Sequence, residues 1–232
     1  MHIHFRSKGK SVFWAALFLL SAGLIAGCAS VDEKSILKSA GGTFKTGLVD
    51  DYALLPREKK EGVRFLRTAG IKMDPYSRVL IEKPELYFDA GARPGDMNPD
   101  ELAQIKNTFV QQVTKILAKS YRVVNGPGKG VIRLRTAFTH LKLGSQTTAA
   151  LGANNLLSNS LFVGNAAFEA ELLDAGNNRR ISAYVDGLAG KRLKSTGVLS
   201  RWPDVEQTLK TWSPSVEEAL NLTFNDNPPP KK

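Results

Sequence analysis

The sequence predicts an α+β fold, with a mixed or antiparallel sheet of about four to five strands and two main helices packed on one face of the sheet. Three observations predict it. Several segments alternate apolar and polar residues with period two, and two segments repeat apolar residues at spacings of three and four. The chain has 232 residues, which suits one domain with tails. The expected order of elements is β-α-β-β-β-β-α.

The first 27 residues have the composition of a secretory signal peptide. Arg6, Lys8 and Lys10 precede an uncharged apolar run over residues 12–27, which leads into Cys28 in the sequence IAGC. This ending resembles the lipobox of bacterial lipoproteins, in which the cysteine becomes the first mature residue and carries acyl chains such as palmitate. An uncleaved membrane anchor is the alternative, but the run is shorter than the roughly 20 apolar residues of a span. We therefore expect Cys28 to be the lipid attachment site.

The residue after the cysteine bears on the destination. An Asp at this position retains many enterobacterial lipoproteins at the inner membrane, and here the residue is Ala29. We therefore expect a protein that is lipid-anchored in the outer membrane through Cys28 and faces the periplasm. Residues 28–43 are expected to form the tether, residues 44–224 a single domain, and residues 225–232 a loose tail rich in Pro and Lys.

The charge balance is basic, with 32 Lys+Arg against 22 Asp+Glu. Such a balance can indicate nucleic acid or an anionic membrane surface as partner. Secretion argues against nucleic acid, so none is expected. Residues 57–83 hold eight cations and four acids, and we expect them to form a solvated basic face, with contact to anionic head groups as the alternative.

The first expected strand covers residues 78–88, where Pro84 predicts an edge strand, a bulge or two short pieces. A helix follows, with Asn98 as N-cap and Pro99 at its first position. Its apolar stripe consists of Leu102, Ile105, Phe109, Val113 and Ile116.

The middle of the chain reads as strand, turn and strand. The glycine-rich segment 126–130 lacks the spacing of a P-loop and leads into a strand, so it predicts a turn. In the strand that follows, Arg133 and Arg135 share one face. The opposite face carries Ile132, Leu134 and Phe138.

A β-hairpin is expected between residues 168 and 186, with the turn DAGNN at 174–178. One face of its first strand carries Phe168, Ala170 and Leu172, and one face of its return strand carries Ile181, Ala183 and Val185. The last element is a helix that Ser213 and Pro214 restart as cap and first residue. Its apolar residues are Val205, Leu209, Trp212, Val216 and Leu220.

The hairpin region contains the acids Glu169, Glu171, Asp174 and Asp186, which are the candidate catalytic groups. The first two lie on the same face of a strand with Cα atoms about 6.6 Å apart, compared with ~5–5.5 Å between the carboxyl groups of retaining glycosidases. A general acid, however, needs a pKa raised by burial, and the alternation favours a solvated outer face. We therefore expect no enzyme activity, with an envelope hydrolase that uses Glu169 and Glu171 as the alternative.

Other chemistry has little support. The mature chain contains one histidine, His140, and its one cysteine follows the leader, so neither a zinc site nor a histidine-based triad is expected. His140 is expected to be a packed or solvated strand residue. No metal or other cofactor is expected.

The segment from residue 143 to 168 contains no Asp, Glu, Lys or Arg. A loop that merely connects two strands is the simpler interpretation. The alternative is a contact surface by which the domain docks on a partner or on a second copy of itself, with its apolar side chains exposed. The candidate residues are Leu151, Leu156, Leu157, Leu161 and Phe162.

Five segments together resemble the bacterial lipoproteins of the domain of unknown function 3313. They are TGLVDDYALLP, PYSRVLIEKPELYF, YRVVNGPGKGVIRLRTAF, FVGNAAFEAELLDAGNNRRISAYVDGLAGKR and TWSPSVEEAL, and the likeness covers residues 45–222. The resemblance implies an envelope lipoprotein without an assigned activity or a known catalytic motif. We expect a non-enzymatic binding or assembly module with an envelope protein as partner or with self-association, and a passive spacer is a further alternative.

Overall fold

The computed structural model describes residues 47–49, 52–56, 61–73, 75–89, 97–144, 156–193 and 197–224. The expected signal peptide, the tether with Cys28, the C-terminal tail and Leu151 lie outside these residues. Among the described residues there is no helix long and apolar enough to cross a membrane.

Strands make up more of the fold than the sequence predicts. The described residues form a mixed sheet of nine strands instead of four to five. Its main path runs β1-β8-β7-β5-β2-β4, while β3 pairs with β5, and β6 pairs with β5 and β9. The strands are β1 (Val63–Arg67), β2 (Arg78–Ile81), β3 (Glu85–Phe88), β4 (Arg122–Val124), β5 (Val131–Gly144), β6 (Leu156–Phe162), β7 (Ala167–Asp174), β8 (Arg180–Asp186) and β9 (Val198–Arg201).

Pro84 divides the first expected strand into two short pieces, as one of its three interpretations predicted. Both pieces run parallel to β5: Ile81 of β2 is opposite Leu134, and Glu85 of β3 is opposite Ala137. Proline has no N–H for the ladder, so the break lies between the two pieces.

Strand β5 bends at His140, which has a φ of 57°. Before the bend, residues 132–139 pair with β7, and after it residues 142–144 pair with β6. A non-glycine residue in this left-handed region is uncommon. The ring nitrogen Nδ1 of His140 lies 3.0 Å from Oδ1 of Asp89, so the histidine is a half-buried corner residue held by a carboxylate.

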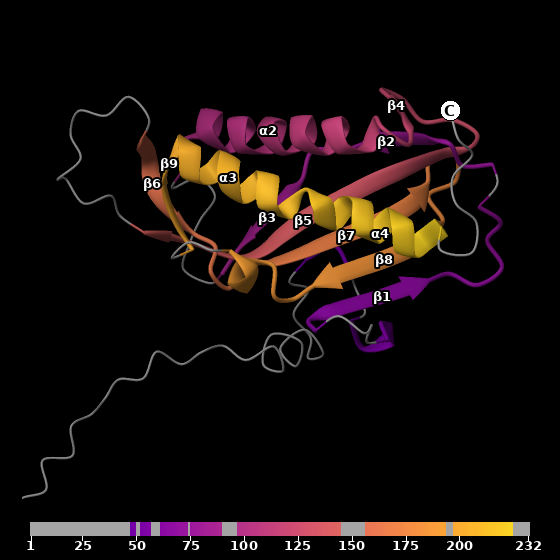
Figure 1. Cartoon of the computed structure of the whole chain (residues 1–232), viewed down its shortest axis with the longest axis horizontal. Helices are drawn as coiled ribbons and strands as arrows, with labels where there is room; N and C mark the ends of the chain where they lie inside the picture. The colour runs from indigo at the N-terminus through magenta and orange to yellow at the C-terminus, as the bar shows by residue number, and fades with distance from the viewer. Residues whose placement is uncertain are drawn as a thin grey trace, which may run out of the picture. The chain divides into compact units, whose positions relative to one another are not determined.

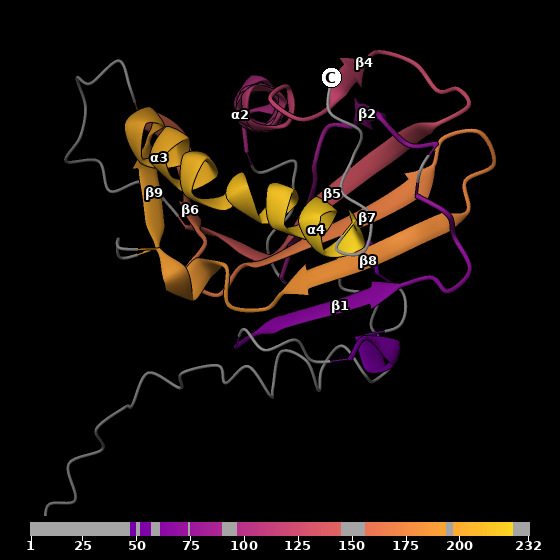
Figure 2. The same ribbon diagram turned by 45° about the vertical axis from the view of Figure 1, so that its right-hand side comes forward.

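Three helices lie on one face of the sheet (Figures 1 and 2): α2 (Pro99–Leu117), α3 (Trp202–Trp212) and α4 (Pro214–Phe224). The predicted N-cap of α2 is confirmed, because the Asn98 side chain accepts a hydrogen bond from Asp100 N at 2.9 Å. Phe109 of α2 lies edge-on to Phe138 of β5, with ring centroids 5.0 Å apart. The predicted apolar stripes therefore face the core.

The break between α3 and α4 is at the predicted place, but Ser213 acts differently. Its hydroxyl donates to the carbonyl of Leu209 in α3, at 2.6 Å, and so does not cap α4. The contact of Ser213 with the first turn of α4 is made by its backbone carbonyl, which accepts a hydrogen bond from Val216 N at 3.1 Å. The reason is geometric: Ser213 has helical backbone angles, which direct its hydroxyl back along the preceding turn.

The alternative interpretation of residues 143–168, an exposed patch of leucines, is wrong for Leu157 and Leu161, and the simpler interpretation, a connecting loop, is wrong for residues 156–162, which form β6. Both leucines belong to β6 and lie in the main core, with 2% and 4% of their surface exposed. They are buried because β5 bends at His140 and continues into pairing with β6. Phe162 remains 39% exposed and covers Gly144, where a Cβ atom would overlap its ring. Leu156 is half-buried.

The sheet is covered on its second face as well. Residues 47–49 and 52–56, which we call the strap, lie on the side away from the helices and include the short 3-10 helix η1 (Tyr52–Leu54; Figure 2). Val49, Tyr52 and Leu55 pack on two residues of β8. Those two residues are Ala183 and Val185, whereas Ile181, expected on the same face, belongs to the main core.

Gly47 shows how closely the strap approaches the sheet. A Cβ atom at this position would overlap the carboxylate of Glu169. We expect Gly47→Ala to push the strap off the sheet and to lower the free energy of unfolding by about 1–3 kcal/mol, as overpacking does. Urea denaturation measures this loss, and limited proteolysis reports the release of the strap.

Gly126→Ala is the matched control for this substitution. Gly126 is exposed, and a Cβ atom there meets nothing within 4 Å. Its effect should stay within about 0.5 kcal/mol. Equal losses for the two variants would show that Gly47 is not specially placed.

Candidate functional site

The four candidate acids do not form one site. Glu169 and Glu171 lie on β7 and face the strap side of the sheet. Asp186, at the end of β8, lines a cavity with residues of α3 and α4 on the helix side. Asp174 lies at the hairpin turn, where its Oδ1 accepts from Gly176 N at 2.7 Å. The structure therefore brings together only the first two.

The expectation that these acids are solvated is wrong for three of the four. Glu169 is 1% exposed, and Glu171 and Asp186 are 2% exposed. Alternation along β7 correctly separates its two faces, but it does not reveal that the strap and neighbouring side chains cover the polar one.

Glu169 binds the strap directly. Its Oε2 accepts hydrogen bonds from Leu48 N at 2.7 Å and Val49 N at 3.1 Å, and its Oε1 accepts from the hydroxyl of Tyr52. A buried carboxylate needs such donors, because burial without them is costly. One side chain of β7 thus fixes a segment about 120 residues earlier in the chain.

Burial raises the pKa of Glu169 above its ordinary value. The Tyr52 hydroxyl and the N–H groups of Val49 and Leu48 act in the opposite direction, since they favour the charged form, and the negative charge of Glu171 adds to the rise. A general acid requires a raised pKa. Among the four candidate acids, Glu169 has this property.

Glu171 is neutralised by two arginines. Its Oε2 lies 3.2 Å from Arg135 Nη1, and its Oε1 accepts from Arg180. Arg135 also binds Glu85 at 3.0 Å, and Glu85 accepts from the hydroxyl of Tyr87. Burial opposes the ionisation of Glu85, but the hydrogen bonds from Tyr87 and Arg135 outweigh it and lower the pKa. This network extends from β8 across β7 and β5 to β3.

Asp186 forms an ion pair with Arg192 and accepts from Leu188 N at 3.0 Å, so it holds the loop after β8. The cavity of about 170 Å³ beside it is also lined by Trp212 and Glu218. Glu169 and Glu171 are not among the residues that line this cavity. Over the described ranges, no group of three or more His, Cys, Asp or Glu side chains could hold a metal ion.

The sequence interpretation missed the partners of the acids. Gly47 and Tyr52 lie in the segment TGLVDDYALLP, which entered only through the family resemblance. Their role follows from a contact between distant parts of the chain, which no local pattern shows. Of the proposed contact residues, Phe162 and Leu156 are accessible on β6, and Cys28 and Leu151 lie outside the described residues.

The raised pKa of Glu169 predicts a specific pH dependence of stability. The folded chain holds this proton more tightly than the unfolded chain, so the contribution of Glu169 is present below the ordinary carboxyl pKa and is lost as the pH rises through the folded value. Glu169→Gln cannot ionise. Its stability should therefore improve relative to wild type as the pH rises above the ordinary carboxyl pKa, where wild type must release the proton of Glu169 or keep it against the pH.

Urea denaturation at several pH values measures this difference. Glu206→Gln, at an exposed position of α3, is the control and should follow wild type at every pH. A constant difference between wild type and Glu169→Gln would contradict a raised pKa.

Comparison with solved structures gives distant similarities. The PelC dodecamer from Paraburkholderia phytofirmans matches with a TM-score of 0.32 and 10% identity, over 68% of this chain and 96% of that one. A putative neuraminyllactose-binding hemagglutinin homolog from Helicobacter pylori matches with a TM-score of 0.40 and 9% identity, over 69% of this chain and 97% of that one. No curated protein matches the sequence.

A family model gives a match over most of the domain. It is described as "Protein of unknown function (DUF3313)" and covers residues 45–216. This range includes the strap, the buried acids of β7 and β8, and all of α2 and α3. The chain therefore belongs to the DUF3313 family, as its sequence segments predicted.

Proposed function

We propose that this chain is an outer-membrane lipoprotein whose domain is a non-enzymatic binding or assembly module that faces the periplasm. The observation that carries the proposal is that every buried acid of the hairpin is used to hold the fold together. Glu169 binds the strap, Glu171 binds two arginines, and Asp186 binds Arg192. Acids occupied in this way support a structural role for the site.

In an anchored protein, the strap would connect the tether to the central sheet. It follows the predicted tether directly, and Glu169 fixes it to the central sheet. The 18 residues between Cys28 and Gly47 can span at most roughly 60 Å at ~3.3–3.6 Å per residue. A force on the anchor would therefore act on the domain where the strap binds Glu169. Such a fixed attachment suits a module that holds a partner near the membrane.

The anchor itself can be tested by Cys28→Ser. Acylation of Cys28 would give a mature protein that begins at this residue, and two or more acyl chains hold a protein stably at a membrane. We expect the variant to lose the acyl mass and the wild-type membrane fractionation. Mass spectrometry and membrane flotation measure both, and an unchanged mass and fractionation would refute the anchor.

The partner surface is proposed at the ribbon of β6 and β9. Within the described sheet, β9 pairs only with β6 and is therefore an edge strand, and edge strands are places where proteins bind extended partners. Phe162 on β6 is one of two large apolar residues described as exposed, the other being Leu54 at 65%. An exposed aromatic next to a sheet edge is a typical contact feature.

Site-specific photo-crosslinking in intact cells tests this surface. A crosslinking residue at position 162 should capture an envelope protein or a second copy of the chain, whereas one at position 54 serves as the exposed apolar control. Capture from position 54 alone would contradict a contact at β6 and β9 and would indicate that the partner binds at the strap. A lack of capture from both positions would favour a passive spacer over a binding module.

An envelope hydrolase is the second candidate, favoured by the burial and raised pKa of Glu169. In this case the strap would have to leave Glu169 before a substrate could reach it. Turnover of cell-wall sugar that disappears in Glu169→Gln but persists in Glu206→Gln would establish this alternative.

A further inference from the structure

One end of the sheet collects segments that are far apart in the sequence. Strands β2, β4 and β5 begin there, since Arg78 is opposite both Arg122 and Val131 in the parallel register. The turn between β7 and β8 lies beside them, because Ala175 N donates to Val131 O at 3.0 Å. The connection from β1 to β2 crosses the same end, where the Tyr76 hydroxyl donates to Asp174 at 2.5 Å.

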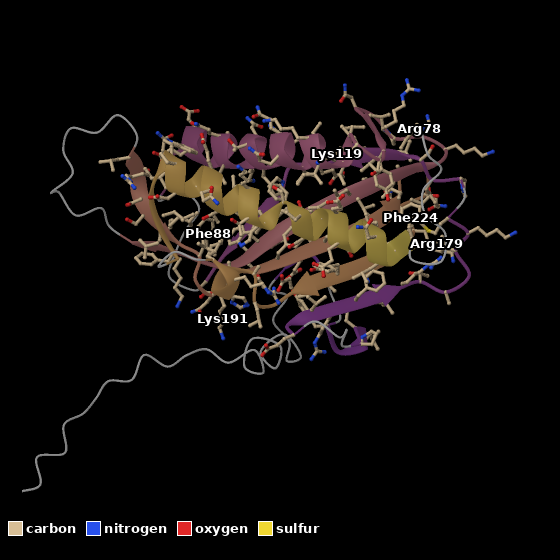
Figure 3. The ribbon with its side chains drawn as sticks, viewed as in Figure 1. Arg78, Phe88, Lys119, Arg179, Lys191 and Phe224 are labelled. Carbon is tan, nitrogen blue, oxygen red and sulfur yellow. The ribbon has the colours of Figure 1, made fainter. Side chains whose placement is uncertain are left out.

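This end is strongly basic, and we call it the basic pole. Figure 3 labels Arg78 and Arg179 at this end of the sheet. Five of its six cations are exposed, and the sixth, Arg78, is half-buried and donates to the carbonyl of Lys129. The six residues are Lys72, Arg78, Lys119, Arg122, Lys129 and Arg179.

None of these six cations forms an ion pair with a carboxylate among the described residues. Asp174, the acid of the neighbouring turn, is bound by Tyr76 and by two backbone N–H groups of the turn, which lower its pKa, and the nearby charge of Arg179 adds to this effect without forming an ion pair. At the opposite end the exposed cations are paired: Lys142 lies 3.6 Å from Asp89, and Arg201 lies 3.4 Å from Asp204. Single exposed cations without an ion pair occur elsewhere among the described residues, as at Lys83, Lys115 and Lys210, whereas the basic pole brings six cations to one end of the sheet.

We propose that the basic pole binds the phosphate groups of anionic phospholipids in the membrane that carries the anchor. The choice of a membrane as occupant rests on the proposed lipid anchor, because an anchored domain with a tether of this reach meets head groups at high local concentration. Each Lys or Arg near an anionic surface contributes about 1 kcal/mol, and the contributions fall off within roughly 10 Å.

The form of the pole fits a peripheral contact. It consists of strand ends and turns, and neither of the exposed large apolar residues in the described ranges lies in it: Leu54 belongs to the strap and Phe162 to β6. Without an apolar side chain to insert, binding depends on charge alone and weakens steeply with salt.

The mature chain with Cys28→Ser, residues 28–232, allows the pole to be tested without acyl chains. We expect it to sediment with vesicles of phosphatidylglycerol and phosphatidylcholine at low salt, and not with vesicles of phosphatidylcholine alone. Lys129→Glu combined with Arg179→Glu should weaken this partitioning at least about tenfold. Both side chains are exposed and form no ion pair with a described carboxylate, so circular dichroism should show an unchanged fold.

Lys83→Glu combined with Lys210→Glu is the matched control, with the same change in net charge at exposed positions of a β2–β3 loop and of α3. It should weaken partitioning by less than about threefold. Equal losses in the two double variants would show that only net charge matters and would contradict the proposal that the basic pole binds the membrane. Absence of wild-type binding would do so as well.

Inorganic phosphate distinguishes a head-group surface from a site for free phosphate. At constant ionic strength, added phosphate should leave vesicle binding unchanged, because the membrane engages many cations together. Competition at low phosphate concentration would contradict the membrane and identify a single anion site. Since the chain used here lacks acyl groups, this outcome is independent of whether Cys28 is lipidated in cells.

Discussion

The structure depends on one buried carboxylate, Glu169. It lies in the centre of β7, a strand that is covered on both faces, and a charged or polar group at such a place must be paired. The pairing comes from the strap, which contributes two N–H groups and the hydroxyl of Tyr52. The strap makes further contacts with the sheet: it packs on Ala183 and Val185, its Pro56 carbonyl accepts from Phe65 N at 3.3 Å, and the carbonyl oxygens of Tyr52 and Leu55 accept from Arg64 at 3.4 Å. Glu169 therefore needs the donors of the strap, and its carboxylate helps to hold the strap on the sheet.

The polar face of the sheet is therefore buried at Glu169 and Glu171 and half-buried around them. Further along this face, Glu171 and Arg135 form a charged network that reaches Glu85 on β3. Such a network favours one register of β3, β5 and β7 over its neighbours, since a shift by one residue would place the same charges in the apolar core. For catalysis, the same arrangement means that a substrate could reach Glu169 only if the strap moved away from it.

The sequence predicts those parts of the fold whose signals are local. Asn98 and Pro99 mark the start of α2, the spacing of Ile105, Phe109 and Val113 marks its buried face, and the turn at 174–178 marks the hairpin. Strands β1, β6 and β9 escape prediction because β1 and β9 are only five and four residues long, and β6 lacks alternation. The burial of Glu169 could not be predicted either, because alternation identifies a polar face but cannot show that a segment about 120 residues away covers it.

The same reasoning explains why the sequence misplaces the uncharged segment and does not reveal the basic pole. The uncharged segment taken alone allows its leucines to be interpreted as an exposed patch. Leu157 and Leu161 are nevertheless buried in the core, because β5 bends at His140 and pairs with β6. The cations of the pole come from six places in the chain, and only the parallel register and the hairpin turn bring them together. Strand β7 connects the two features: Glu169 binds the strap, and Asp174, five residues further and about 17 Å along the strand, begins the turn that carries Arg179. Because the strap is bound to Glu169 of β7, the length of this strand sets the distance between the strap and the basic pole.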